Sequence, residues 1–527
     1  MPADRRAATA VAIALAVAGG VLGAAPGGPA RAQGDAGTAD APQTAIPWLG
    51  DSLDRPTRAD ERPAAPPAAN PVTVTTLGAT RADAAGLLPG SVTGLPADTI
   101  AGSDPTRLAA LYRRQPADAL PAMHGLVRML LLAELDPPRA ASADDSLFAA
   151  RIDALMRLGA VEQAQALLER AGPRDRALFA RWFDAALLTG DDEAMCAALR
   201  AAPALAPGLD GRVFCLARGG DFPAAWLTLD GARALDVLDA QADRRLAQFL
   251  DPELYEGVPP PPAPRPMTPL AFRLLDGIGE TPATRDLPAA YAVADLRRTS
   301  GWKAQIDAAE RLARTGALDA NRLLALYTAR RPSASGGAWE RAAAVQALDD
   351  ALTRADAAAV AAALPHAVAR MAEAGLLVPL ATLYGARLAE LELQGMACHL
   401  AKRLALLSPD PAAAVARIDP DAAADLPPRL AFATALARGA APDPPPGDAL
   451  ARTVADGLAA APPADLMRLV AEDRLGEALL TVAARLGDGA ASDPQDAVEG
   501  LAFLRGVGMT DVAMRTAMQM LLAETAP

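Results

Sequence analysis

The sequence predicts an all-α protein, an α-solenoid of irregular antiparallel helix pairs that is preceded by a signal peptide and a disordered arm. Three observations predict this class. The 527-residue chain is rich in Ala and Leu and only 4% aromatic, a composition that favours helix over sheet. From residue 104 onward, Gly and Pro separate helical stretches of about ten to sixteen residues. Some of these Gly residues also recur at fixed offsets from apolar residues, as repeated helix pairs require.

Residues 1–32 have the three parts of a secretory signal peptide. Asp4-Arg5-Arg6 precedes an apolar stretch over residues 7–25, and Ala30-Arg31-Ala32 supplies an A-x-A ending, so we expect cleavage after Ala32. The alternative is an uncleaved anchor, although three Gly residues make the apolar stretch a weak membrane span. Cleavage would place the mature protein in a bacterial periplasm.

Residues 33–103 form a Pro- and Ala-rich stretch with no helical period, which predicts a disordered or extended arm. Two apolar islands interrupt it. The first contains Ile46, Trp48 and Leu49, a candidate for docking onto a partner, and the second, over residues 72–77, alternates like an edge strand. Both islands have an alternative role, which is to fold back onto the protein's own helices.

The repeat pattern is clearest around Gly159, Gly190 and Gly220, which are 31 and 30 residues apart. Each Gly follows one predicted helix and precedes the next, where a tight turn is needed. The positions that share this spacing lie seven residues before, four or five after and nine after each Gly: Ile152, Phe183 and Val213; Ala164, Ala194 and Ala225; Leu168, Leu199 and Leu229. Such offsets let apolar side chains meet across a helical hairpin.

The predicted repeats fall into three blocks, over residues 104–257, 270–441 and 448–527. A Pro-rich linker over 258–269 and a Pro-rich break over 442–447 separate them, because closely spaced Pro residues are incompatible with helix. A looser form of the pattern surrounds Gly316, Gly375, Gly476 and Gly508, which predicts irregular units as far as the C-terminus. Each unit must stack on its neighbours to bury its apolar face, which would give a curved array with one concave side.

The small residue after the turn, as in Gly159 with Ala164 and Gly220 with Ala225, resembles the tetratricopeptide and Sel1-type repeat families. The resemblance covers about three units, and the Trp and Tyr of good tetratricopeptide units are mostly missing. The segments 46–49 and 131–138 are also similar to a family of uncharacterised exported proteins of alphaproteobacteria. These resemblances imply a helical-repeat fold and an exported location, and they imply no activity.

Cys196 and Cys215 are the strongest local signal for chemistry. Pro203 and Pro207 bracket the turn between them, so the two cysteines would lie side by side in an antiparallel hairpin. An oxidising compartment would then favour a structural disulfide, the alternative being two buried thiols. The redox spacing C-x-x-C does not occur.

The other candidate groups predict neither catalysis nor a cofactor. Cys398 and His399 are sequence neighbours and would point about 100° apart on a helix, so they do not act on one group. His124 and His366 stand alone in helical contexts, and the sequence has no H-x-x-x-H metal motif, no phosphate-binding G-x-x-x-x-G-K and no G-x-S-x-G elbow. We therefore expect no catalytic residue, no cofactor and no metal.

The charge balance and these missing motifs narrow the function. A net charge of −13 disfavours nucleic acid, and no later stretch is apolar enough for a stable membrane span after signal cleavage. We expect a non-enzymatic periplasmic scaffold or adaptor that binds a protein partner of the cell envelope through its solenoid surface. The alternative is an envelope enzyme accessory, or a superhelical protein that resembles lytic transglycosylases and acts on peptidoglycan. The Glu-Ser pair of that family's catalytic domain does not occur here.

Overall fold

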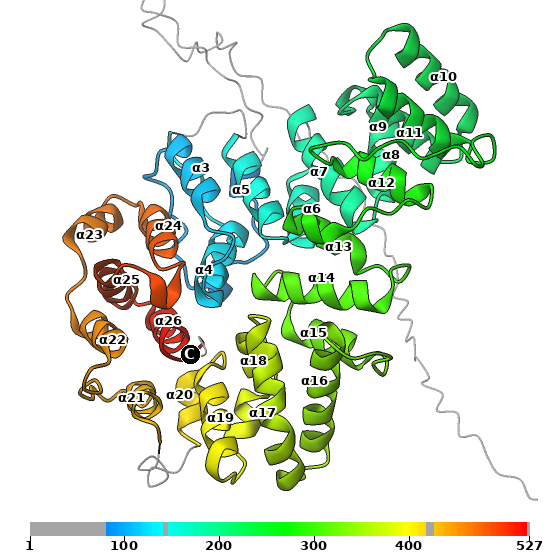
Figure 1. Cartoon of the computed structure of the whole chain (residues 1–527). Helices are drawn as coiled ribbons and strands as arrows, with labels where there is room; N and C mark the ends of the chain where they lie inside the picture. The colour runs from blue at the N-terminus through cyan, green and yellow to red at the C-terminus, as the bar shows by residue number, and fades with distance from the viewer. Residues whose placement is uncertain (1–80, 141–145, 174, 418–425, 524–527) are drawn as a thin grey trace, which may run out of the picture. The chain divides into compact units, whose positions relative to one another are not determined.

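The computed structural model describes residues 81–140, 146–173, 175–417 and 426–523, and within these ranges the chain is all-helical (Figure 1). The only β-type pairing described there is an isolated bridge between Leu88 and Ala133. The predicted signal peptide and residues 33–80 of the predicted arm lie outside the described residues. The all-α class is thus confirmed, whereas the solenoid arrangement and the signal peptide stay predictions.

The first half of the described chain contains short helical turns followed by longer helices. The short ones are η1 (Ala82–Ala84), α2 (Gly90–Thr93) and, between two of the longer helices, η2 (Pro203–Leu205). The longer ones are α3 (Pro105–Arg114), α4 (Pro121–Leu132), α5 (Ser146–Arg157), α6 (Val161–Ala171), α7 (Arg176–Thr189), α8 (Glu193–Ala201), α9 (Leu209–Arg218), α10 (Phe222–Ala234) and α11 (Ala240–Leu250).

The second half continues in the same style. Its helices are α12 (Pro269–Gly277), α13 (Ala292–Asp295), α14 (Trp302–Arg314), α15 (Ala320–Thr328), α16 (Ala338–Thr353), α17 (Ala357–Glu373), α18 (Leu377–Ala389), α19 (Gly395–Leu406), α20 (Pro411–Val415), α21 (Pro428–Ala437), α22 (Ala449–Ala459), α23 (Ala464–Ala471), α24 (Leu475–Arg485), α25 (Pro494–Gly506) and α26 (Thr510–Leu522). Among all the described residues, no helix is both long and apolar enough to cross a bilayer.

Aspartate side chains begin many of these helices. Their carboxylates accept hydrogen bonds from first-turn amides that have no partner inside the helix. The aspartates that do so are Asp104, Asp175, Asp221, Asp239, Asp319, Asp356, Asp410, Asp448 and Asp493. These nine aspartates, of the 63 acidic residues in the sequence, therefore stabilise helix starts.

The three turn glycines lie where the sequence predicts them, between consecutive helices. Gly159, Gly190 and Gly220 have φ of 79°, 83° and 81°, a left-handed conformation that favours Gly. The apolar positions seven before and nine after each Gly are at most 2% exposed. Of the three small residues that follow the turns, Ala164 and Ala225 are buried but Ala194 is exposed, because the chain after Gly190 takes two further residues before α8 begins.

Gly476 departs from the predicted pattern, because it lies inside α24 instead of in a turn. The turn falls at Asp473, whose φ is 57°. Gly476 is instead a packing position. A Cβ there would lie 2.5 Å from Cγ2 of Ile100, and its amide donates to the Thr99 carbonyl at 2.8 Å.

The predicted boundary of the arm at residue 103 is too late, since residues 81–103 are already part of the folded body. Leu95 and Ile100 are each 5% exposed. Arg151 of α5 holds this segment, donating to the carbonyls of Asp83 and Ala85 while it also donates to Leu131 and Ala133. The sequence does not reveal this ordering, because the ordering depends on Arg151, which lies far from this segment along the chain.

Consecutive helices pack against one another through most of the body, as in α5 with α6, α9 with α10, α16 with α17 and α18 with α19. The two ends of the described chain also meet. α24 packs against α3 and α4, and α26 packs against α4, so blue and red helices lie side by side in Figure 1. An open array would keep its two ends apart. The contacts of α24 and α26 with α3 and α4 therefore differ from the open, concave array that the sequence predicts.

The two Pro-rich stretches connect helices without forming helix themselves. Residues 258–268 run from the loop after α11 to the start of α12 at Pro269, and 442–447 lies between α21 and α22. The first stretch is tied to its surroundings, since Arg245 donates to the Pro262 carbonyl and Tyr291 Oη donates to the Met267 carbonyl at 2.7 Å.

Candidate functional site

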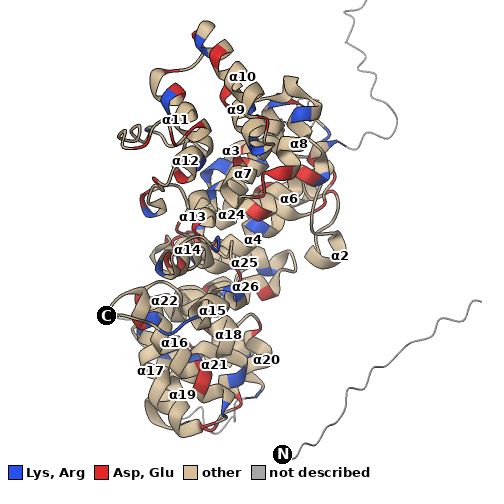
Figure 2. Ribbon diagram, turned by 90° about the vertical axis from the view of Figure 1, so that its right-hand side faces the viewer, with Lys and Arg blue, Asp and Glu red and all other residues tan. Residues whose placement is uncertain are grey.

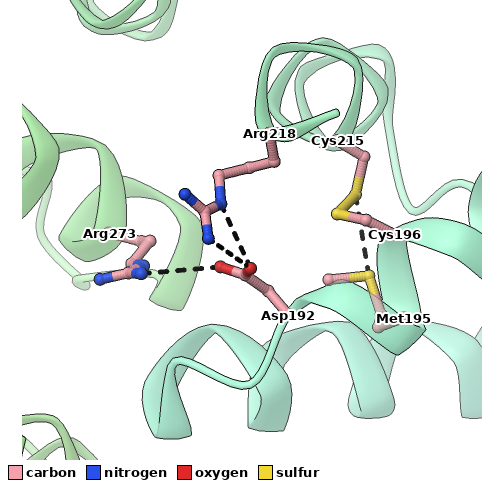
Figure 3. Close-up of a disulfide and its surroundings, with 6 residues drawn as sticks. All are labelled: Asp192, Met195, Cys196, Cys215, Arg218 and Arg273. Carbon is pink, nitrogen blue, oxygen red and sulfur yellow. Dashed lines mark hydrogen bonds and ion pairs between the residues drawn. A yellow bond between two sulfur atoms is a disulfide. The ribbon is translucent and has the colours of Figure 1, made fainter. Parts of the chain in front are cut away.

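The structure joins Cys196 of α8 to Cys215 of α9 in a disulfide, with their Cα atoms 5.1 Å apart (Figure 3). The two cysteines are 2% and 1% exposed, and Met195 places its Sδ 3.8 Å from Cys215 Sγ. The geometry is that of the predicted hairpin, in which a turn over residues 202–208 brings the helices back alongside one another. The bond is shielded from solvent, which suits a structural role.

A buried carboxylate lies beside the disulfide. Asp192 is 2% exposed, and its Oδ1 accepts from Arg218 Nη2 at 3.0 Å and from Arg218 Nε at 3.2 Å. On the other side Arg273 of α12 places Nη2 3.6 Å from Oδ2, which has no hydrogen-bond donor in the described structure (Figure 3). Sequence inspection of Asp191-Asp192-Glu193 suggests only a favourable interaction with the helix dipole, so it misses this contact between α8, α9 and α12.

The charged network continues from Arg273 to Asp276 and Arg297. Arg273 Nη1 lies 3.1 Å and Arg297 Nη2 2.9 Å from Asp276 Oδ2. Burial alone would raise the pKa of Asp276, but the Thr281 hydroxyl and Arg297 more than offset burial and hold that pKa below its ordinary value. The alternation of guanidinium and carboxylate groups ties the α8–α12 region to the segment after α13.

A hollow of about 970 Å³ lies between the segment after α12, the region around α13, α14 and the start of α16. Its lining includes several Asp, Glu and Arg side chains. Glu310, 2% exposed, is held by Arg341 through two contacts of 2.7 and 2.5 Å, and Tyr327 Oη donates to it at 2.8 Å. Burial, reinforced by Glu310, raises the pKa of Tyr327, so Tyr327 stays a hydrogen-bond donor.

A second acid in the same hollow, Asp295, accepts a hydrogen bond from the Thr284 hydroxyl. Burial raises the pKa of Asp295, and the opposing effects of Thr284 and Arg297 do not cancel it. Arg311 on the adjacent wall donates to the carbonyls of Thr284 and Leu287, and burial lowers its pKa. Most of these charged side chains therefore hold neighbouring segments together across the hollow. No cysteine or histidine is among the described residues that line it.

The remaining predicted residues are scattered. Ile46, Trp48 and Leu49 lie outside the described residues. Cys398 and His399 are both partly exposed on α19. His124 is 3% exposed in α4, where burial and the nearby Arg128 outweigh the Pro116 carbonyl and lower its pKa. No group of three or more His, Cys, Asp or Glu that could hold a metal occurs among the residues described.

Comparisons of the chain with known protein families, with curated protein sequences and with solved structures gave no match. The function therefore has to be argued from the chain's own residues. The described residues contain a buried disulfide, a network of Arg and Asp side chains between helices, and a hollow whose buried acid, Glu310, is paired with Arg341.

Proposed function

We propose that the protein is a non-enzymatic scaffold or adaptor of the bacterial cell envelope, which binds a protein partner through the surface of an irregular α-solenoid. On this proposal the signal peptide directs export to the periplasm and is removed after Ala32. The mature protein then acts without a cofactor or metal.

The observation that carries this proposal is the packing of consecutive helices into pairs along most of the described chain. Helix pairs of this kind bury one face of each helix and leave the opposite faces along the array available to other proteins. The buried disulfide adds support for an oxidising compartment, since such bonds persist mainly in exported proteins. The tetratricopeptide-like and Sel1-like features of the sequence agree with binding of this kind.

The proposal is tested by recovering the tagged full-length chain from the envelope of its source bacterium after mild crosslinking in living cells. We expect a processed form whose N-terminus is Gln33, crosslinked reproducibly to one envelope protein. Recovery from the cytoplasm in unprocessed form would contradict the proposed location. Absence of a reproducible crosslinked protein would contradict the adaptor function.

The hollow supports a second candidate function, an enzyme that acts on peptidoglycan. A general acid needs a raised pKa, and burial raises the pKa of Asp295 in a hollow wide enough for a sugar. Zymography on cell-wall material tests this candidate. Clearing by the wild-type chain and no clearing by Asp295→Asn would replace the adaptor proposal with the enzymatic one.

A further inference from the structure

Large apolar side chains are exposed in one region far more than elsewhere in the described chain. Of the eight large hydrophobic residues that are strongly exposed, six lie between residues 222 and 258. The four on α10 and the turn that follows are Leu227, 75% exposed, Leu235, 68%, Val237, 56%, and Phe222, 46%. Apolar side chains that gather in this way mark interaction sites more often than single exposed residues do.

The position of α10 explains why these side chains have no cover. The helix packs mainly on α9 and α11, and its buried residues are Ala225, Leu229 and Ala232. Helical geometry places Leu227 and Asp230 on the opposite side, whereas Trp226 packs against the core. Figure 1 shows α10 at the outer edge of the α8–α12 region, away from the helices at the two ends of the described chain. The outermost helix of a stack ordinarily presents a polar outer face, so an apolar one leaves the stack without a cap.

The charge around this surface is strongly one-sided. Residues 221–258 contain eight acidic and three basic residues. Arg233 is engaged by Asp230 at 2.8 Å and by Asp243 at 2.6 Å, and Arg245 is buried beneath the Pro-rich stretch. Among the basic residues only Arg244 remains to offset the surrounding carboxylates. Basic and acidic residues are interspersed along the ribbon in Figure 2, and the excess of acidic residues in this segment is a local feature.

We infer that the outer surface of α10 and the turn after it, formed by Leu227, Leu235 and Val237, docks a basic amphipathic helix of a partner protein. An added helix would pack on the outer side of α10, with its apolar face on Leu227 and Leu235. Its Lys and Arg side chains would lie over the surrounding carboxylates, which would speed association and exclude acidic partners. The inference rests on the proposed adaptor function and names the chemistry of its partner.

The test uses the full-length chain and a fluorescently labelled designed peptide with Leu on one helical face and Arg on the other. Binding is measured by fluorescence anisotropy at several salt concentrations. We expect the wild-type chain to bind the peptide with an affinity that falls as salt rises. A peptide with the same apolar face and Glu in place of Arg should bind at least about tenfold more weakly.

Variants locate the binding on α10. Leu227→Ser and Leu235→Ser should each weaken binding about tenfold, as loss of a central contact does. Met396→Ser removes a side chain of similar exposure, 65%, on α19 and should leave binding unchanged. All three residues are exposed, so the thermal midpoint should stay the same, and circular dichroism checks this.

Three outcomes would overturn the inference: equal binding of the two peptides, wild-type affinity in both α10 variants, or a dimer that Leu227→Ser dissociates. The last would show that a second copy covers α10. The envelope crosslinking experiment distinguishes failure of this inference from failure of the proposed adaptor function. A partner captured equally by the wild-type and Leu227→Ser chains would leave the adaptor function standing and remove the role of α10.

Discussion

Arg151 shows at the residue scale how one buried side chain organises a segment that the sequence leaves without structure. Its guanidinium donates to Ala133 and Ala85, each at 2.7 Å, and to the carbonyls of Leu131 and Asp83. Burial lowers the pKa of Arg151, since the charged form loses water, and the carbonyl dipoles replace part of that solvation.

Replacing Arg151 with Met should therefore destabilise the fold by about 3 kcal/mol, because four carbonyl groups would be left with fewer donors. Urea unfolding followed by circular dichroism measures the change. Arg285→Met is the matched control, since that side chain is 85% exposed, and should change stability by less than about 0.5 kcal/mol. Equal stabilities of the two variants would show that Arg151 does not anchor residues 81–88.

His124 makes the stability depend on pH in a predictable direction. Burial, the first cause, and Arg128 lower its pKa in the folded state, so the folded protein favours neutral imidazole. As pH falls through the ordinary His pKa of about 6.5, the unfolded chain takes up a proton that the folded chain resists. Stability from this group is therefore present above that pH and is lost progressively below it.

A His124→Gln variant should lose less stability than the wild type between pH 7.5 and pH 5.5, about one pH unit on either side of the ordinary His pKa. Thermal unfolding at each pH gives the comparison. His366→Gln is the control, because the two substitutions are chemically identical. A wild-type pH profile that is unchanged by His124→Gln would assign the acid sensitivity to other groups.

At the scale of elements, the disulfide between α8 and α9 closes a loop with a sequence separation of 19 residues. A loop of this length contributes about 3 kcal/mol through the lost freedom of the unfolded chain. The Cys196→Ser, Cys215→Ser double variant should be destabilised by about that amount, and a reducing agent should destabilise the wild type equally while leaving the double variant unaffected. Cys398→Ser provides the control, and guanidinium unfolding is the measurement. Loss of stability on reduction in both chains would mean that the bond is not responsible.

Local sequence signals were sufficient to predict the helical elements. They did not predict contacts between residues that lie far apart in the sequence. The turns at Gly159, Gly190 and Gly220 follow from chain-local chemistry, since a left-handed position next to a helix end favours Gly. Gly476 has the same apparent spacing but serves close packing against Ile100, which no local rule reveals. The Cys196–Cys215 pair was predictable because its partners lie on one hairpin.

The charged clusters could not be predicted, because their members lie far apart in sequence. Asp192 pairs with Arg273, which follows it by 81 residues in the sequence. Glu310 pairs with Arg341, and the whole of α15 lies between them in the sequence. Arginine and aspartate are common throughout the chain, so composition does not select these pairs. Exposed side chains on α10 escape prediction for a related reason, since the periodic pattern does not say which helix ends a stack.

At the scale of the whole folded unit, the contact between its two ends is the feature with the widest consequences. The Gly102 amide donates to the Asp473 carbonyl at 2.9 Å, and Gln115 Nε2 donates to the Leu480 carbonyl at 3.0 Å. The Ala122 amide donates to Gln519 Oε1 at 2.8 Å. Ordinary repeat arrays gain stability only from neighbouring units and fray at their ends. Here each end is covered by the other, so both should be protected against local opening.

Gly102→Ala tests this coupling directly. A Cβ at Gly102 would lie 1.9 Å from the Glu472 carbonyl oxygen, a backbone atom that cannot move aside alone, so the two ends must separate locally. We expect faster hydrogen exchange in α3, α4, α24 and α26, because these helices form the contact between the two ends. Exchange in α9 and α16, which lie outside this contact, should change little. Gly125→Ala is the matched control, since a Cβ there meets nothing within 4 Å, and it should keep or slightly increase protection in α4. Faster exchange confined to the segment around Gly102 would show that the two ends are stable independently and that the closure adds no cooperativity.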